Sequence, residues 1–149
     1  MLRLSRKTTL ALEAVLDIAY NARPDPVQSR DITARQGIPQ RYLEQVLQKL
    51  VREGVLRGVR GPRGGYILAR ERRRVTLGDV VRVVQSLDTD DDPTPSTAPL
   101  GEKVIAPLWE GVESEILRRF DTITMEDLCR QARGQGIPRA DGTMPDYTI

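Results

Sequence analysis

SRDITARQGIPQRYLEQVLQKLVREG, residues 29–54, contains two helical patterns with almost no chain between them. The first pattern follows Ser29, has Asp31 in its first turn and ends before Gly37, a residue typical of helix C-termini. The second pattern carries one apolar stripe at three- and four-residue steps, made of Leu43, Val46, Leu47 and Leu50. Two helices joined by the tight turn at residues 37–39 predict a helix-turn-helix.

The segments on either side of this stretch predict a helix and a β-hairpin. Upstream, residues 6–22 have apolar residues at helical spacing, with Ser5 as a suitable N-cap and Pro24 as a stop. Downstream, residues 55–59 and 66–69 read as two short strands, and the RGPRGG turn between them is basic and rich in glycine. These strands predict a hairpin with a narrow tip.

A fourth helix completes this amino-terminal unit. It opens at Thr76 with Asp79 three residues on, and Val75 is placed to contact Val80. The order helix, helix-turn-helix, hairpin, helix is that of a winged helix. We therefore expect a mainly α fold with a small β-hairpin, in which residues 1–87 form a winged helix-turn-helix domain that binds DNA.

The rest of the chain is organised differently. Residues 88–102, DTDDDPTPSTAPLGE, predict an acidic, proline-rich linker, with a solvated spacer favoured over a cation site. Residues 103–134 predict a long helix that begins near Pro107 and a short, capped last helix. Residues 135–149 have no period and predict a loosely ordered tail.

Composition narrows the function. The chain has no histidine and one cysteine, Cys129, which excludes histidine-based catalysis, an internal disulfide and a self-contained zinc site. We therefore predict no catalytic residue, no metal and no cofactor, and expect the protein not to be an enzyme. Cys129 is expected to be a small buried hydrophobe rather than a redox sensor. No targeting or membrane segment is apparent, and a reducing cytoplasm suits the cysteine content.

Charge is distributed unevenly along the chain. Residues 1–87 carry 17 Lys and Arg against 8 Asp and Glu, whereas residues 88–149 carry 6 against 13. A basic amino-terminal part followed by an acidic remainder is typical of a polyanion-binding module joined to a segment with another task. Double-stranded DNA is the expected polyanion, and no membrane partner is expected.

The second helix of a helix-turn-helix presents its amino-terminal side chains to base edges in the major groove. Arg can grip guanine, Gln can grip adenine and Glu can accept from cytosine. An ordinary solvated helix face is the alternative interpretation, and Tyr42 is expected to be a packing residue more than a phosphate contact. The predicted DNA-contacting residues of this helix are Gln40, Arg41, Tyr42, Glu44, Gln45 and Gln48.

The glycine-rich hairpin turn is the more specific signal. Guanidinium groups on a narrow turn can enter a minor groove whose negative potential attracts them. A merely basic turn is the alternative, and the loop lacks the ending of a phosphate-binding loop. Arg70–Arg74, RERRR, is expected either to follow phosphates or to be a solvated charge run. The further predicted DNA contacts are Arg3, Ser5, Arg57, Arg60 and Arg63.

The long helix has an apolar seam that is too wide for a helix packed at one edge. Pairing with a second copy would bury it, and a twofold dimer would present two recognition helices about one DNA turn, or a multiple, apart. Folding of the seam onto its own domain is the alternative. The predicted dimer-interface residues are Ile105, Leu108, Trp109, Val112, Ile116 and Phe120.

Several segments, in order, resemble the Rrf2 family of bacterial winged-helix regulators. These are RLSRKTTLALEAVLDIA, QGIPQRYLEQVLQKLVREGVL, VRGPRGGYILA and LGDVVRVVQ, followed by APLW and ITMEDL near the end. The resemblance implies a homodimeric transcription factor, with the helix near residues 107–120 as the dimer helix and Arg60 as a minor-groove contact. Iron-sulfur members carry three linker cysteines, whereas residues 88–109 contain none. The resemblance therefore implies a cluster-free member.

These observations predict a sequence-specific transcriptional regulator that acts as a homodimer on a (pseudo)palindromic operator, without an iron-sulfur cluster. The alternative is a winged-helix protein-protein interaction module that does not bind DNA. Cluster-free members of the family sense through a partner protein or by other means, so an effector protein or a small molecule is a further expected partner.

Overall fold

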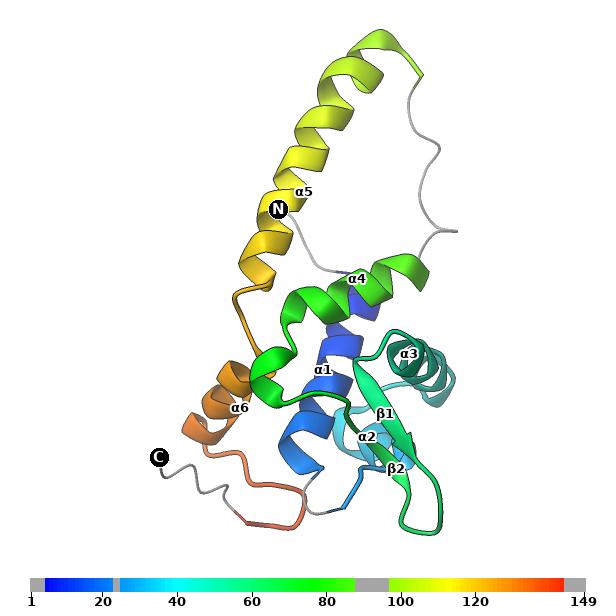
Figure 1. Ribbon diagram of the computed structural model, residues 1–149, viewed down its shortest axis with the longest axis vertical. Helices are drawn as coiled ribbons and strands as arrows, with labels where there is room; N and C mark the ends of the chain where they lie inside the picture. Colours follow the sequence, from blue (N-terminus) through cyan, green and yellow to red (C-terminus); the bar gives the residue numbers. More distant parts are fainter. Residues whose placement is uncertain (1–4, 23–24, 88–96, 144–149) are drawn as a thin grey trace.

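The computed structural model describes residues 5–22, 25–87 and 97–143. Figure 1 shows one long helix that projects from a body built by the other elements. In chain order the elements are α1 (Arg6–Asn21), α2 (Ser29–Gln36), α3 (Gln40–Arg52), β1 (Leu56–Val59), β2 (Gly65–Leu68), the 3₁₀ turn η1 (Arg72–Arg74), α4 (Leu77–Leu87), the π-helical turn η2 (Gly101–Ile105), α5 (Ala106–Phe120) and α6 (Met125–Gly134). The mainly helical fold with a small hairpin is confirmed.

Helix α1 is the central element of the body, which we call the head: α1 to α4, β1, β2 and α6. It contacts α2, α3, α4, α6 and β2, and its Ala11, Val15 and Ile18 are fully buried. The Ser5 hydroxyl accepts a hydrogen bond from the Thr8 amide at 3.2 Å, so Ser5 is the N-cap that the sequence predicts. The core that surrounds α1 is aliphatic.

The helix-turn-helix consists of α2 and α3, as predicted. Gly37 ends α2 in the left-handed conformation, with φ of 68°, which a residue with a side chain rarely adopts. Ile38, the middle residue of the turn, is buried beneath the two helices. The stripe of Leu43, Leu47 and Leu50 is also fully buried, so the opposite face of α3 is left to solvent.

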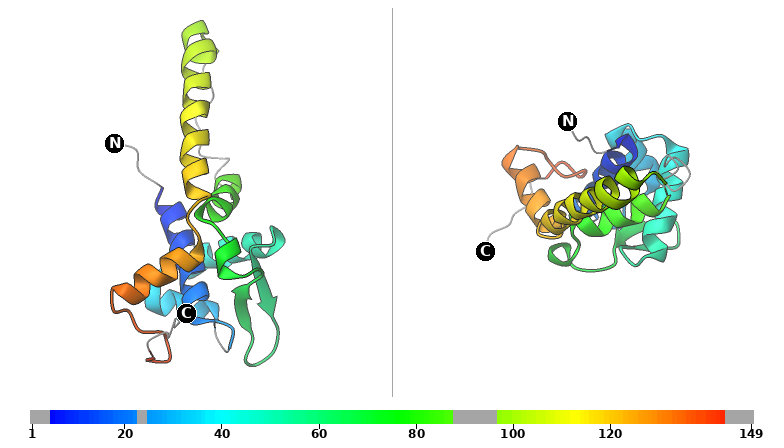
Figure 2. Two further views of the ribbon diagram at one scale, coloured as in Figure 1. Left: turned by 60° about the vertical axis from the view of Figure 1, so that its left-hand side comes forward. Right: turned by 90° about the horizontal axis from the view of Figure 1, so that it is seen from above.

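The wing is an antiparallel hairpin in which Leu56 pairs with Leu68 and Val59 with Gly65. Its outer edge is bonded to the loop before α2: the Val27 amide donates to the Tyr66 carbonyl at 3.0 Å, and the Tyr66 amide donates back at 2.7 Å. A Cβ at Gly65 would lie 2.4 Å from the Val27 carbonyl oxygen, so this approach requires glycine there. Figure 2 shows the wing extending from the same side of the head as α3.

The long helix α5 begins at Ala106, beside the predicted Pro107, and is preceded by a π-helical turn that the sequence does not predict. Helical backbone passes through Pro107 without a break, because η2 precedes it and the Ala106 amide donates to the Gly101 carbonyl, five residues back. Proline lacks an amide hydrogen and crowds the preceding turn, and the wider π-helical turn accommodates it. The start of α5 at Ala106 thus agrees with the predicted start near Pro107, while η2 before it overlaps the last residues of the predicted linker.

Part of the expected loose tail is bonded to the head. The Tyr20 hydroxyl donates to the Ile137 carbonyl, and the Ala140 amide donates to Asn21 Oδ1 at 2.8 Å. Residues 137–143 thus run back along the end of α1. Within the described residues, no helix combines the length and the apolar character needed to cross a membrane.

Candidate nucleic-acid interface

The exposed side of α3 carries the predicted base-reading residues. Gln40, Arg41, Glu44, Gln45 and Gln48 are all exposed. Tyr42 is half-buried against the core, and its hydroxyl donates to the Lys7 carbonyl, which ties α3 to the start of α1. Among the predicted contacts outside α3 and the wing, Ser5 is the N-cap of α1, and Arg3 lies outside the described residues.

The predicted residues of α3 divide between two surfaces. Gln45 and Gln48 line a groove of about 330 Å³ together with the cationic side chains of Lys7, Lys49 and Arg52. A groove with this charge suits a phosphate backbone. Gln40 and Glu44 lie on the side that faces α2, where Gln40 is hydrogen-bonded to α2 residues.

The wing presents three guanidinium groups to solvent. Arg57, Arg60 and Arg63 are exposed, and none takes part in an ion pair between described residues. A Cβ at Gly64 would lie 2.2 Å from the Val59 carbonyl oxygen, so glycine keeps the tip narrow. A groove of about 460 Å³ separates the wing from the start of α2, and the Gln28 amide reaches across to the Pro62 carbonyl at 3.5 Å.

Most arginines of the basic run after the wing, residues 70–74, form ion pairs within the protein. Arg70 pairs with Asp79 at 3.5 Å, Arg73 with Glu71 at 2.7 Å, and Arg72 with Glu126 of α6 at 3.2 Å. The last of these pairs joins η1 to α6. Most of RERRR therefore has carboxylate partners in the chain, unlike the wing arginines.

A buried ion pair that the sequence analysis missed joins α1 to α2. Asp17 Oδ2 accepts from Arg35 Nε at 2.9 Å and from Gln36 Nε2 at 2.8 Å, and Asp17 Oδ1 accepts from Arg35 Nη2 at 2.7 Å. The hydrogen bond to Asp17 raises the pKa of Arg35 above its usual value. A single carboxylate within an apolar helix face is the signal for such a pair, since a buried charge needs a partner.

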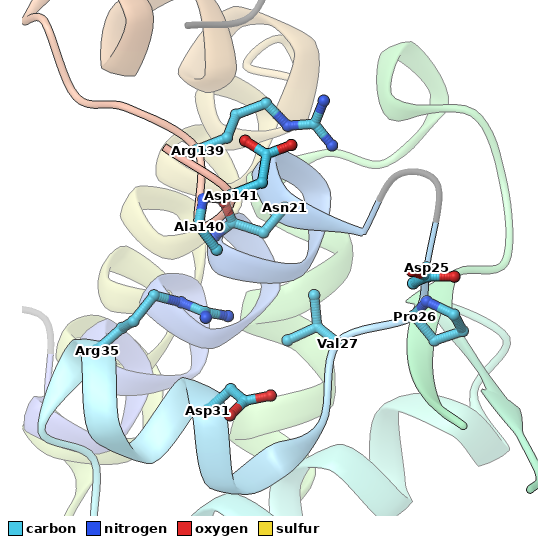
Figure 3. Close-up of a pocket in the computed structure, with 9 residues that line it drawn as sticks. All are labelled: Asn21, Asp25, Pro26, Val27, Asp31, Arg35, Arg139, Ala140 and Asp141. Carbon is cyan, nitrogen blue, oxygen red and sulfur yellow. Dashed lines mark hydrogen bonds between the residues drawn. The ribbon is translucent and has the colours of Figure 1, made fainter. Parts of the chain in front are cut away.

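A cavity of about 380 Å³ lies beside this pair, between the end of α1, α2 and residues 139–141 (Figure 3). Arg35 and Asp31 face it from α2, while Arg139 and Asp141 face it from the returning tail (Figure 3). Its size suits a small molecule, and its lining is polar with charges of both signs. A molecule held there would contact the first helix of the helix-turn-helix.

Helix α5, together with Ile105 of η2 before it, exposes half of the predicted seam. Leu108 is 62% exposed, Trp109 is 45% exposed and Ile105 is exposed as well, whereas Val112, Ile116 and Phe120 are half-buried. The exposed apolar side chains continue towards the start of the helix with Val104 and Leu100. The left view in Figure 2 shows α5 projecting from the head, with its last turns nearest to it.

Cys129 is fully buried on α6, packed into the core of the head. It therefore occupies the place of a small apolar side chain, as the sequence predicts. In the described part of the chain, no three His, Cys, Asp or Glu side chains gather in a way that could hold a metal ion.

Comparison with known proteins identifies the family. A family model described as Rrf2, iron-dependent transcriptional regulator, matches residues 4–131. The HTH-type transcriptional regulators IscR of Cronobacter sakazakii and of Escherichia coli K12 are each 33% identical over 129 residues, which cover 85% of this chain and 80% of theirs.

Two solved structures have the same fold. The T. potens IscR structure has a TM-score of 0.72 at 33% identity, covering 94% of this chain and 95% of that one. The structure of CymR (YrzC), the global cysteine regulator of B. subtilis, has a TM-score of 0.67 at 26% identity, covering 88% and 98%. The family model matches most of the chain, and the chain has the winged-helix fold of the related structures. This chain is therefore a DNA-binding transcriptional regulator of the Rrf2 family, and not an enzyme.

Proposed function

We propose that this regulator binds a (pseudo)palindromic operator as a homodimer and works without an iron-sulfur cluster. The observation that carries the proposal is the contrast among its arginines. Those of the wing have no carboxylate partner among the described residues, while most of the neighbouring RERRR run is paired. Arginines that stay unpaired and exposed are available to an external polyanion.

In the proposed complex, α3 reads bases and the wing adds groove and phosphate contacts. Arg41 and Glu44 are exposed side chains near the amino-terminal end of α3, the part that meets base edges in this motif. Arg60 lies at the narrow tip of the wing, where a guanidinium can enter a minor groove. Gln45, Gln48 and the cations of their groove would follow the backbone.

The proposed dimer forms through α5. Each exposed side chain of the seam, such as Leu108 or Trp109, leaves apolar surface in water that a second copy would bury at about 25 cal/mol per Å². A helix that extends away from its own head can pair with another without moving the DNA-binding elements (Figure 1). Such an arrangement is twofold, which matches a palindromic operator.

The donor chemistry of this chain does not fit an iron-sulfur cluster, although the matching family is described as iron-dependent. Clusters are held by thiolates, with histidine as an occasional replacement. The chain has no histidine, and its one cysteine is buried in the head on α6. We therefore propose that regulation passes through an effector protein or a small molecule, in the cytoplasm where the DNA is.

Selection of bound duplexes from a random-sequence pool, followed by anisotropy titrations over a range of salt, tests the DNA-binding proposal. Arg60→Ala should weaken binding and reduce the salt slope by about one. Arg73→Ala removes the same charge from an arginine already paired with Glu71, so it should change the slope much less. Equal slopes for the two variants would contradict the wing's role. Absence of any selected sequence would favour the protein-interaction alternative.

Protein purified without oxygen tests the cluster-free state. It should be colourless and contain no stoichiometric iron, and Cys129→Ala should bind the selected operator with unchanged affinity. Visible absorbance that accompanies bound iron would refute this part of the proposal while leaving DNA recognition intact.

A further inference from the structure

We propose that Gln40 is a positioning residue: it holds Glu44 in the orientation in which Glu44 selects a base pair. The inference rests on the proposed function of α3 as the recognition helix and assigns a specific role within it. Gln40 occupies the first position of α3, where the motif leads one to expect a base reader. Its side chain is instead committed to neighbours within the protein.

Three hydrogen bonds hold the Gln40 amide. Its Nε2 donates to Glu44 Oε1 at 2.9 Å and to Ser29 Oγ at 3.3 Å. Its Oε1 accepts from the Thr33 hydroxyl at 2.7 Å. Ser29 and Thr33 lie on one side of α2, a turn apart, so the amide is fixed between two α2 residues and the next turn of α3.

The chemistry of these partners fixes which way the amide faces. An ionised carboxylate can only accept hydrogen bonds, so the nitrogen of Gln40 must face Glu44. The oxygen then faces Thr33, whose hydroxyl can donate. A glutamine that reads adenine offers a donor and an acceptor together, but both donor hydrogens of Gln40 are already used. Base reading by Gln40 would therefore require it to give up one of its Nε2 hydrogen bonds, to Glu44 or to Ser29.

Glu44 is the residue that gains from this arrangement. Its Oε1 is held by Gln40, which restricts its rotamers, and no hydrogen bond between described residues uses Oε2. A carboxylate oxygen in the major groove accepts from the exocyclic amino group of cytosine. An acceptor held in place before binding loses less conformational freedom on binding, which sharpens its preference. Cytosine N4 is therefore the proposed ligand of Glu44, with Gln40 acting through it.

A hydroxyl on α2 provides the test, because Thr33 lies outside the recognition helix and its hydroxyl donates to Gln40. We would select the operator with the wild-type chain and then measure affinities for all its single-base variants. Thr33→Val removes the donor at nearly constant shape, Gln40→Leu removes the amide, and Glu44→Ala removes the reader. Thr33→Ser keeps the hydroxyl and serves as the matched control.

Thr33→Val and Gln40→Leu should both reduce discrimination by about fivefold, the lower end of one base contact, at the base pair that Glu44→Ala also relaxes. Thr33→Ser should retain the wild-type preference, and affinity for unrelated DNA should stay constant. The inference is overturned if Gln40→Leu relaxes a different base pair from Glu44→Ala, or if Thr33→Val leaves the preference unchanged. If the wild-type chain selects no sequence, both this inference and the proposed function are overturned. If it selects a sequence but the variants behave otherwise than expected, only the role of Gln40 is overturned.

Discussion

Arg82 of α4 and Asp121, which follows α5, meet in a two-point ion pair: Nη1 lies 2.6 Å from Oδ1 and Nη2 lies 2.8 Å from Oδ2. The hydrogen bonds from Arg82 lower the pKa of Asp121. The carboxylate reaches this place only because residue 78 on α4 has no side chain. A Cβ at Gly78 would lie 1.9 Å from Asp121 Oδ1. The connection between the head and the projecting helix therefore depends on a glycine.

Gly78→Ala should lower the melting temperature, because the added methyl group displaces Asp121 and opens its pair with Arg82. Alanine is favoured over glycine within a helix by about 1 kcal/mol. A lower melting temperature would therefore mean that the displaced ion pair outweighs this helix preference. Gly134→Ala is the control, since a Cβ there meets nothing within 4 Å. If the Gly78→Ala protein melts at or above the wild-type temperature, Asp121 can move away from the added methyl group without destabilising the protein.

Arg35→Ala should destabilise the head by about 3 kcal/mol or more, because it leaves a buried carboxylate with the Gln36 amide alone. The Asp17 side chain is 0% exposed, so its carboxylate depends on hydrogen-bond partners within the protein. Urea unfolding measures the loss. Arg30→Ala, an exposed change on the same helix, should have almost no effect, and adding Asp17→Leu to Arg35→Ala should recover part of the stability. A loss no larger than that of Arg30→Ala would count against the buried pair.

Leu108→Glu should give a monomer that remains folded, because Leu108 is largely exposed in the single chain and the new charge faces the proposed partner. Ile116 is half-buried, so Ile116→Asp would disturb the protomer as well. Sedimentation velocity at micromolar concentration, with circular dichroism for folding, measures both properties. Glu110→Ala, on the other side of α5, is the control. A dimeric Leu108→Glu protein would place the interface elsewhere.

Asp127→Asn should remove part of the acid sensitivity of the fold. The backbone amide and then the hydroxyl of Thr124 lower the pKa of Asp127. A carboxyl group whose pKa is lower when folded stabilises the protein above its unfolded pKa, and that stabilisation disappears as the pH falls through the folded value. Urea unfolding from neutral to acidic pH should therefore show wild type and variant converging at low pH. If the free energies of unfolding of wild type and variant differed by the same amount at every pH, the Asp127 carboxylate would not be the source of the acid sensitivity.

Local signals in the sequence predicted the helix starts well. Thr76 with Asp79 and Thr124 with Asp127 each form the reciprocal capping bonds expected from their three-residue spacing. Such caps involve only one turn of chain, so their geometry follows from the residues themselves. The turn at Gly37 was predictable for the same reason.

Contacts between distant elements were not predictable in this way. The sequence analysis did not single out Asp17, and nothing in the sequence showed that Arg35 would reach it. Gln40 was predicted as a base reader because its amide suits adenine, and only the packing of α3 beside α2 shows that its hydrogen bonds are already made. Local rules placed the start of α5 near Pro107, but they gave no sign of the π-helical turn that precedes it.

The paired backbones of Val27 and Tyr66 have a consequence for the DNA. They join the wing to the loop that leads into α2, so the spacing between the tip and α3 is set by the protein's own hydrogen bonds. If the spacing between the wing tip and α3 is fixed, the protein cannot adjust it to DNA grooves of different width. On the proposed operator, the duplex would have to bend or twist to fit it, and base steps that deform easily would be favoured at positions that no side chain touches.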